Sequence, residues 1–215
     1  MEKTASKEQI VKTLLEKAKS LPPGTAISTA QLYNLVYPNG QSDSKDLFQL
    51  HFELEARSKK VGLFFDSSAH WNLCEGLPYN LDFVIRPRQR NINFDKIRYC
   101  ESAYPGPDEI LLIDFGDKSI CSYEAYKDIP KPYKCSREQW HDIIDLIKDC
   151  NFAQWERKYN NRYILDGMQW EIELIKNERT RKKIYGSNEF PAAWRIFEAL
   201  KQKCIQLMNN QNSHL

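Results

Sequence analysis

Three serines, each followed three residues later by a glutamine, mark where helices of this chain begin. The sequences are SKEQ at Ser6, STAQ at Ser28 and SREQ at Ser136. At a helix N-cap the serine hydroxyl accepts a hydrogen bond from an unpaired backbone N–H, and the glutamine side chain reaches back to the N-cap amide. The three signatures predict helices that begin directly after residues 6, 28 and 136.

Residues 7–85 follow the order helix, short strand, helix, helix and hairpin. The first helix ends at LPPG and the second at PNG, because proline cannot continue a helix. The third begins at about Ser44 and places apolar side chains on one face, namely Leu47, Leu50, Leu54 and Val61. VGLFFDSSAHWNLCEG, residues 61–76, predicts two strands around a polar turn at residues 66–68.

This layout resembles that of winged helix-turn-helix domains, through element order and spacing rather than an invariant motif. In DNA-binding members the third helix enters the major groove and the wing touches the backbone. The resemblance implies that the groove-facing side lies opposite the leucines and carries Lys45, Gln49, Phe52, Ala56, Lys59 and Lys60. Glutamine can read adenine and lysine can hold phosphates, so these residue types suit groove contact.

The same helix also suits a protein partner. It carries Asp46, Glu53 and Glu55, which would repel a phosphate backbone, and residues 1–90 hold twelve basic and ten acidic side chains. Phe48 and Phe52 are expected on the exposed side, where aromatic rings favour protein contact. DNA contact and protein contact both stay open for this domain.

An arginine row marks the predicted domain boundary. Arg86, Arg88 and Arg90 alternate with Pro87 and Gln89, so an extended backbone would place all three on one side. Such a row can clamp phosphates or an acidic partner surface, or it can be a solvated linker. Because apolar patterning stops here, the sequence predicts two domains, residues 1–90 and 91–215.

The second domain is expected to be a two-layer α+β fold, with an antiparallel sheet and two helices. EILLIDFGDKSICSYEAY alternates apolar and polar residues around Gly116 and Asp117, which predicts a hairpin. One amphipathic helix follows Ser136, and a last one is expected to open at Pro191. The tryptophans of this half are expected in the core, namely Trp140, Trp155, Trp170 and Trp194.

A second predicted hairpin, turning at residues 177–179, holds the most basic stretch of the chain. Its cations are Lys176, Arg179, Arg181, Lys182 and Lys183, against one acidic residue. This pattern is typical of an anion-binding surface, and equally of a solvated hairpin.

Acidic residues near the preceding strand raise a nuclease hypothesis, in which Asp166, Glu171 and Glu173 would hold a metal ion. Asp166 and Gly167 also form a tight-turn signal. In a strand, Glu173 and Lys176 are three residues apart and point to opposite faces, so they cannot share one metal-bound water. The spacing therefore disfavours catalysis here.

Other enzyme and cofactor signals are missing from the sequence. It contains no phosphate-binding glycine loop, GxSxG or HExxH motif, and the six cysteines are widely spaced, which predicts free, mostly buried thiols. We expect no metal and no cofactor. The absence of an export signal and of an 18-residue apolar run predicts a cytoplasmic protein without a membrane span.

The pairing of GLPYNL with DGMQWEIEL and YGSNEFP resembles a group of uncharacterised bacterial and mobile-element proteins, and it implies no activity. The sequence predicts a non-enzymatic protein that engages nucleic acid or a nucleoprotein complex through basic surfaces. It would act as a bacterial regulator or a phage-borne inhibitor. The alternative is a protein-interaction module built on Phe48, Phe52, Glu53 and Glu55, and the third hypothesis is a divergent metal-dependent nuclease.

Overall fold

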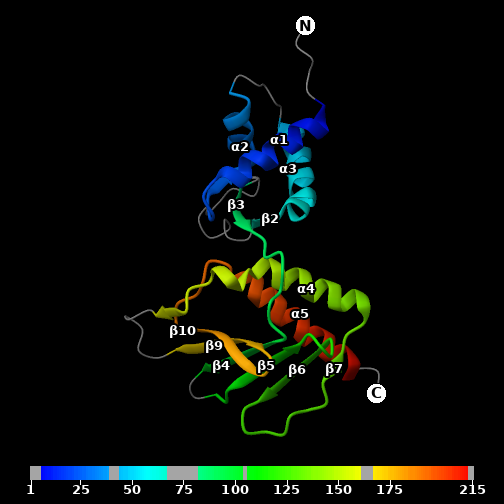
Figure 1. The fold of residues 1–215 in the computed structure, drawn as a ribbon, viewed down its shortest axis with the longest axis vertical. Coiled ribbons are helices and arrows are strands. Elements are labelled where there is room, and N and C mark those ends of the chain that lie inside the picture. Colours follow the sequence, from blue (N-terminus) through cyan, green and yellow to red (C-terminus); the bar gives the residue numbers. More distant parts are fainter. Residues whose placement is uncertain (1–5, 39–43, 67–81, 104–105, 161–166, 213–215) are drawn as a thin grey trace. The chain divides into compact units, whose positions relative to one another are not determined.

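The computed structural model describes residues 6–38, 44–66, 82–103, 106–160 and 167–212. It is a mixed α+β structure that divides into two compact units, residues 1–90 and 91–215 (Figure 1). Unit 1 is the first of these and unit 2 the second. No helix in the described ranges is long and apolar enough to cross a membrane.

Unit 1 packs three α-helices against a small antiparallel sheet of order β1-β3-β2. Its elements are α1 (Lys7–Ser20), β1 (Ala26–Ser28), α2 (Thr29–Val36), α3 (Ser44–Ser58), η1 (Lys59–Val61), β2 (Leu63–Asp66) and β3 (Asp82–Pro87). The predicted helix starts are confirmed, because the hydroxyls of Ser6 and Ser28 accept from the backbone N–H of Gln9 and Gln31. The capping box at Ser28 is complete.

β2 pairs with a strand that the sequence did not predict, because its partner among the described residues is β3. Residues 69–76, read as the returning strand of the wing, lie outside the described residues. Phe83, Val84 and Ile85 form a continuous buried run at the centre of the sheet, which is typical of a strand covered on both faces. Arg86 lies opposite Phe64 in this ladder, so it belongs to the sheet and not to a linker.

A buried histidine lies in the core of unit 1. The Nδ1 atom of His51 lies 3.0 Å from the Oγ1 atom of Thr29, and the imidazole ring packs at 5.6 Å from Phe83. Burial lowers the pKa of His51 below the ordinary 6.5, although the charge of Glu55 acts in the opposite direction. The fold therefore favours the neutral imidazole.

We expect unit 1 to lose stability as the pH falls from about 7 to about 5.5, because the unfolded histidine takes up a proton that the folded one resists. Amide hydrogen exchange of α3, followed at several pH values in the whole chain, measures this loss. His51→Asn should remove the slope, whereas His141→Asn, at a side chain that is 75% exposed, should keep it. If the stability of unit 1 still falls with pH in His51→Asn, the effect comes from carboxylates and not from His51.

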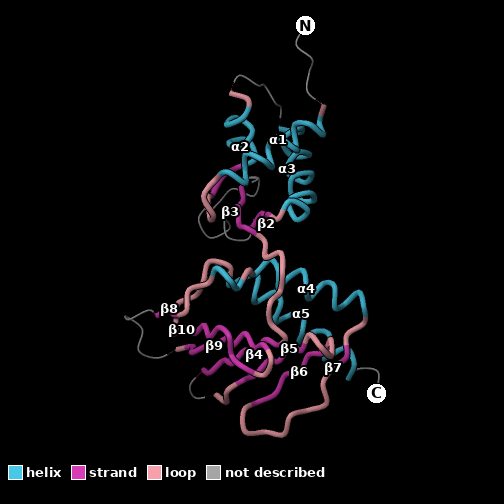
Figure 2. The backbone as a smooth tube through the Cα atoms, in the orientation of Figure 1, coloured by secondary structure: helices cyan, strands magenta, loops and turns pink. Residues whose placement is uncertain are grey.

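Unit 2 is a seven-stranded sheet of order β7-β6-β5-β4-β9-β10-β8 with α4 and α5 together on one of its sides (Figures 1 and 2). Neighbouring strands are antiparallel, except β8, which runs parallel to β10. The elements are β4 (Lys96–Ala103), β5 (Glu109–Asp114), β6 (Ser119–Glu124), β7 (Tyr133–Lys134), α4 (Arg137–Cys150), η3 (Phe152–Gln154), β8 (Lys158–Asn160), β9 (Met168–Lys176), β10 (Arg179–Ser187) and α5 (Trp194–Asn212).

Local signals in unit 2 agree with the structure, with one shift. The capping box at Ser136 is complete, and β5 and β6 form the hairpin expected around Gly116. The β9–β10 turn forms at Asn177 and Glu178, both with positive φ. The last helix begins at Trp194 instead of Pro191, because residues 191–193 form a turn in which the Trp194 N–H donates to the Pro191 carbonyl.

Aromatic side chains fill the space between the sheet and the helices of unit 2. All four predicted core tryptophans are buried, and Trp170 and Trp194 pack with ring centres 4.6 Å apart. Phe152 and Phe197 are completely buried next to them. The thiols of Cys121, Cys150 and Cys204 are buried as expected, whereas Cys100 and Cys135 are partly exposed and Cys74 lies outside the described residues.

Candidate functional site

The outward face of α3 carries most of the residues predicted for partner contact in unit 1. Leu50 and Leu54 are buried against the core, and the opposite side of the helix exposes Lys45, Gln49, Phe52 and Ala56. Lys59 and Lys60, also exposed, lie in η1 directly after the helix. Phe48 and Phe52 are about half exposed and pack edge to face, with ring centres 4.8 Å apart. This face and η1 together therefore combine cations, an amide and an aromatic pair.

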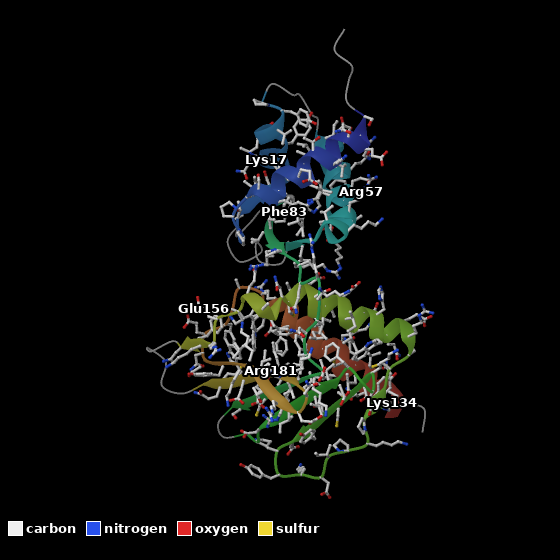
Figure 3. All side chains as sticks on the ribbon, in the orientation of Figure 1. Lys17, Arg57, Phe83, Lys134, Glu156 and Arg181 are labelled. Carbon is white, nitrogen blue, oxygen red and sulfur yellow. The ribbon has the colours of Figure 1, made fainter. Side chains whose placement is uncertain are left out.

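One carboxylate of α3 is neutralised by neighbouring cations. The Oε1 and Oε2 atoms of Glu53 lie 3.8 Å from Lys7 Nζ and 3.1 Å from Arg57 Nη2, and Arg57 is labelled on α3 in Figure 3. Arg57 also lies 3.8 Å from Glu8 of α1. Glu53 is therefore drawn toward α1, which reduces its repulsion of an anion on the outward face.

The fold brings part of the arginine row next to the end of α3. The Arg88 N–H donates to the Gly62 carbonyl at 2.9 Å, and the Gly62 N–H donates to the Lys59 carbonyl at 3.2 Å. The guanidinium of Arg90 also lies against Gly62, because a Cβ atom there would meet Arg90 Nε at 3.3 Å. The backbone segments that carry these cations thus lie side by side, and residues 59–60 and 86–90 are together termed the basic cluster of unit 1.

The basic hairpin of β9 and β10 is less available than the sequence suggests. The expectation that Lys182 is a solvent-facing binding residue is wrong. Its ammonium donates to the backbone carbonyls of Phe152 at 2.9 Å, Ala153 at 3.1 Å and Trp155 at 2.6 Å. Burial, with a smaller effect from the charge of Arg157, lowers the pKa of Lys182. Lys182 therefore caps the C-terminal end of η3.

Two further cations of this hairpin have partners within unit 2. Lys183 Nζ lies 2.7 Å from Glu171, and this hydrogen bond raises the pKa of Lys183. Lys176 Nζ donates to the Asn93 side chain. Arg179 and Arg181 are exposed as the sequence suggested, and Lys183 also stays exposed although it pairs with Glu171.

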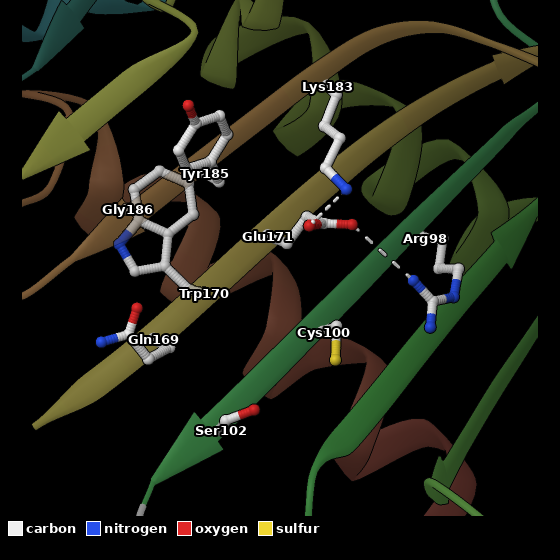
Figure 4. Close-up of a pocket in the computed structure, with 9 residues that line it drawn as sticks. All are labelled: Arg98, Cys100, Ser102, Gln169, Trp170, Glu171, Lys183, Tyr185 and Gly186. Atoms are coloured by element: carbon white, nitrogen blue, oxygen red, sulfur yellow. Dashed lines mark ion pairs between the residues drawn. The ribbon is translucent and has the colours of Figure 1, made fainter.

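Glu171 and Glu173, the two carboxylates of the nuclease hypothesis, lie on the sheet face away from the helices of unit 2. As the alternation predicts, Trp170, Ile172 and Leu174 are buried, and the two glutamates point to the other side. Arg98 of β4 lies 3.3 Å from Glu173 and 4.0 Å from Glu171. Figure 4 shows Lys183 and Arg98 reaching Glu171 from opposite sides.

This charge network borders an open hollow of about 520 Å³. The hollow is lined by Arg98, Cys100, Ser102, Gln169, Trp170, Glu171, Lys183, Tyr185 and Gly186 (Figure 4). Its cations and carboxylates compensate each other, which suits a neutral or zwitterionic contact better than a phosphate. Asp166, the third residue of the nuclease hypothesis, lies outside the described residues, and the described ranges contain no group of three metal-ligating side chains.

Sequence reasoning missed the β4 side of this hollow. The segment KIRYCES alternates Ile97 and Tyr99, which are buried, with Arg98 and Cys100, which face the hollow. That period of two predicts a two-sided strand. The pairing of Arg98 with Glu173 depends on strand order, which the pattern does not contain.

No protein-family model matches the chain, and a search of curated proteins also finds no match.

Proposed function

We propose that the chain is a non-enzymatic, cytoplasmic protein that binds nucleic acid, and that unit 1 is a winged helix whose α3 contacts the duplex. The observation that carries this proposal is the outward face of α3, where Lys45, Gln49 and Phe52 are exposed away from the core. The element order of unit 1 and the sheet order β1-β3-β2 support the winged-helix assignment.

Binding would depend mainly on phosphate contacts. The basic cluster of residues 59–60 and 86–90 lies at the end of α3, where it can displace counterions along the backbone of a duplex. Gln49 can hydrogen-bond to the edge of an adenine, and the Phe52 ring can contact the methyl group of a thymine. Few base contacts imply modest sequence preference. A regulator that binds DNA and an inhibitor that fills the nucleic-acid channel of a larger complex both fit this surface.

The aromatic pair supports a second candidate function, a protein-interaction module. Phe48 and Phe52 are 51% and 52% exposed, and Glu55 is exposed on the same helix. Aromatic anchors beside a carboxylate fit a basic protein surface with an apolar pocket.

A charge reversal separates these functions. We expect Lys45→Glu to weaken binding of a mixed-sequence DNA duplex by the full chain and to make the log–log salt slope shallower by about 0.9, the value for one lost phosphate contact. Fluorescence anisotropy over a series of salt concentrations measures both. Lys12→Glu, an equal charge change on the exposed side of α1, is the matched control and should keep the wild-type slope.

The opposite pattern would support the protein-interaction module. If Lys45→Glu and Lys12→Glu reduce duplex binding equally, α3 is not the contact surface and the nucleic-acid proposal fails. If the wild type does not bind duplex and Phe52→Ser instead abolishes a salt-insensitive association with a purified partner, the second candidate stands.

A further inference from the structure

The sheet of unit 2 has an incompletely covered edge at β6. β7 pairs only with Ser119 and Ile120, whereas β6 continues to Glu124. Among the described residues, no strand pairs with β6 on that side beyond Ile120. The second half of β6 therefore forms a border of the sheet.

Two backbone hydrogen bonds show which groups of β6 point outward. The Cys135 N–H donates to the Lys118 carbonyl at 3.0 Å on the β7 side, and the Ala125 N–H donates to the Asp108 carbonyl at 2.7 Å on the β5 side. The polar backbone groups of alternate residues point to the same side of an antiparallel strand. Ser122 therefore has the same backbone orientation as Lys118, so its N–H and C=O point away from β5, toward the uncovered edge.

A groove of about 530 Å³ runs along this edge. Ile205 and Met208 of α5 form its apolar wall on the helix side. The other wall comes from the loop between β6 and β7, where the Pro130 carbonyl lies 3.5 Å from Cys121 Sγ on the opposite face of the sheet. In the same loop Tyr126 is fully exposed and Ile129 is 64% exposed. The edge of Ser122 is therefore accessible between two walls that can hold side chains.

The end of the groove is acidic. Glu109 and Glu124 are directly opposite each other in the β5–β6 ladder, and Glu109 also pairs with Glu101. Lys201 lies 2.6 Å from Glu101, whereas the cation beside Glu124 among the described residues is the exposed Lys127 at 2.7 Å. Like charges directly opposite destabilise a sheet, so a cation placed beside Glu109 and Glu124 would be favoured.

We propose that the β6 edge binds an extended segment of a partner protein, which adds a strand antiparallel to β6 in continuation of β7. Residues opposite Glu124 and Ser122 would point to the helix side, where they meet the carboxylates and the Ile205–Met208 wall respectively. Because the added strand runs opposite to β6, its pattern from N to C is basic, any residue, apolar. Backbone pairing supplies affinity and the two pockets supply specificity. This site is independent of nucleic-acid binding by unit 1.

A second copy of the chain fits this edge less well. A two-fold β6–β6 pair centred on Ser122 would set Glu124 opposite Ile120 of the other copy, whose edge β7 already fills. The acidic ends would gain no compensating cation. A short basic and apolar segment meets neither obstacle.

The probe is the peptide acetyl-Thr-Arg-Thr-Ile-Thr-amide, titrated into the full chain and followed by the backbone amide resonances of β6. We expect a Kd of about 0.1–1 mM with the largest shift at Ser122. In the proposed register the isoleucine N–H pairs with Ser122 and the central threonine N–H points to solvent. N-methylation of the isoleucine should therefore weaken binding about tenfold or more, and N-methylation of the central threonine should not.

Ser122→Pro tests the same edge from the protein side. Proline removes an N–H that the β5 ladder does not use, so the chain should fold and lose probe binding. If this variant does not fold, the assigned direction of the Ser122 N–H is wrong and the proposal fails. No shift at Ser122 up to about 5 mM peptide, or equal weakening by both N-methyl peptides, also overturns it. A concentration-dependent dimer that Ser122→Pro abolishes would assign the edge to a second copy instead.

Discussion

Lys182→Met is expected to lower the free energy of unfolding by about 3 kcal/mol, although the residue lies in a basic run that looks solvent-facing. The ammonium has three donors, and the structure supplies three carbonyl acceptors at 2.6–3.1 Å, those of Phe152, Ala153 and Trp155. Methionine keeps the apolar stem but leaves these acceptors without their charged donor at the end of a helical segment. Urea unfolding monitored by circular dichroism measures the change.

Lys183→Met provides the matched control one residue away. Its ammonium pairs with Glu171, and the side chain is 52% exposed, so the loss should be no more than about 1 kcal/mol. Equal losses in the two variants would mean that the Lys182 contacts contribute little beyond a surface ion pair.

Gly186→Ala is expected to destabilise unit 2 by about 3 kcal/mol or to prevent its folding. A Cβ atom at Gly186 would lie 2.4 Å from Cε2 and Nε1 of Trp170, well inside van der Waals contact. The indole cannot move away easily, because Nε1 donates to the Glu189 carbonyl at 3.0 Å and the ring packs at 4.6 Å from Trp194. The urea midpoint of the full chain, read from tryptophan fluorescence, reports the loss.

Gly116→Ala is the corresponding control in a turn of the same unit. The nearest atom to its new Cβ would be an Asp114 carboxylate oxygen at 3.4 Å, an ordinary contact, so stability should change by about 0.5 kcal/mol or less. Trp170→Phe removes the atoms nearest to the new methyl group. The double variant Gly186→Ala with Trp170→Phe should lose less free energy of unfolding than the sum of the losses in the two single variants. Strict additivity would contradict the proposed clash.

Features that depend on a few neighbouring residues could be predicted from the sequence. The capping box at Ser136 and the turn at Asn177 each arise within four residues, so their physical causes are visible in a short window. The buried face of β9 was also predictable, because the side-chain period of a strand fixes which residues share a face. The mixed α+β character of the chain followed from these local patterns.

The environment of individual charges could not be predicted in the same way. Lys182 and Lys183 are adjacent and look equivalent in sequence, but one contacts carbonyls 27–30 residues away and the other a carboxylate on the next strand. The end of strand β3 was read as part of a boundary, because Arg86 and Pro87, with the arginines that follow them, obscured the apolar run before them. In both cases the deciding contact depends on which distant segments pack together.

The central position of β3 affects how unit 1 folds during synthesis. Among the described residues, β1 and β2 do not pair with each other, and each pairs only with β3, which comes last among the three in the chain. During synthesis from the N-terminus, the helices can collapse early, but the sheet cannot form until Pro87 has left the ribosome. The final residues of the unit therefore control the completion of its fold, and an emerging chain that stops before residue 82 would expose two unpaired strand edges to other chains.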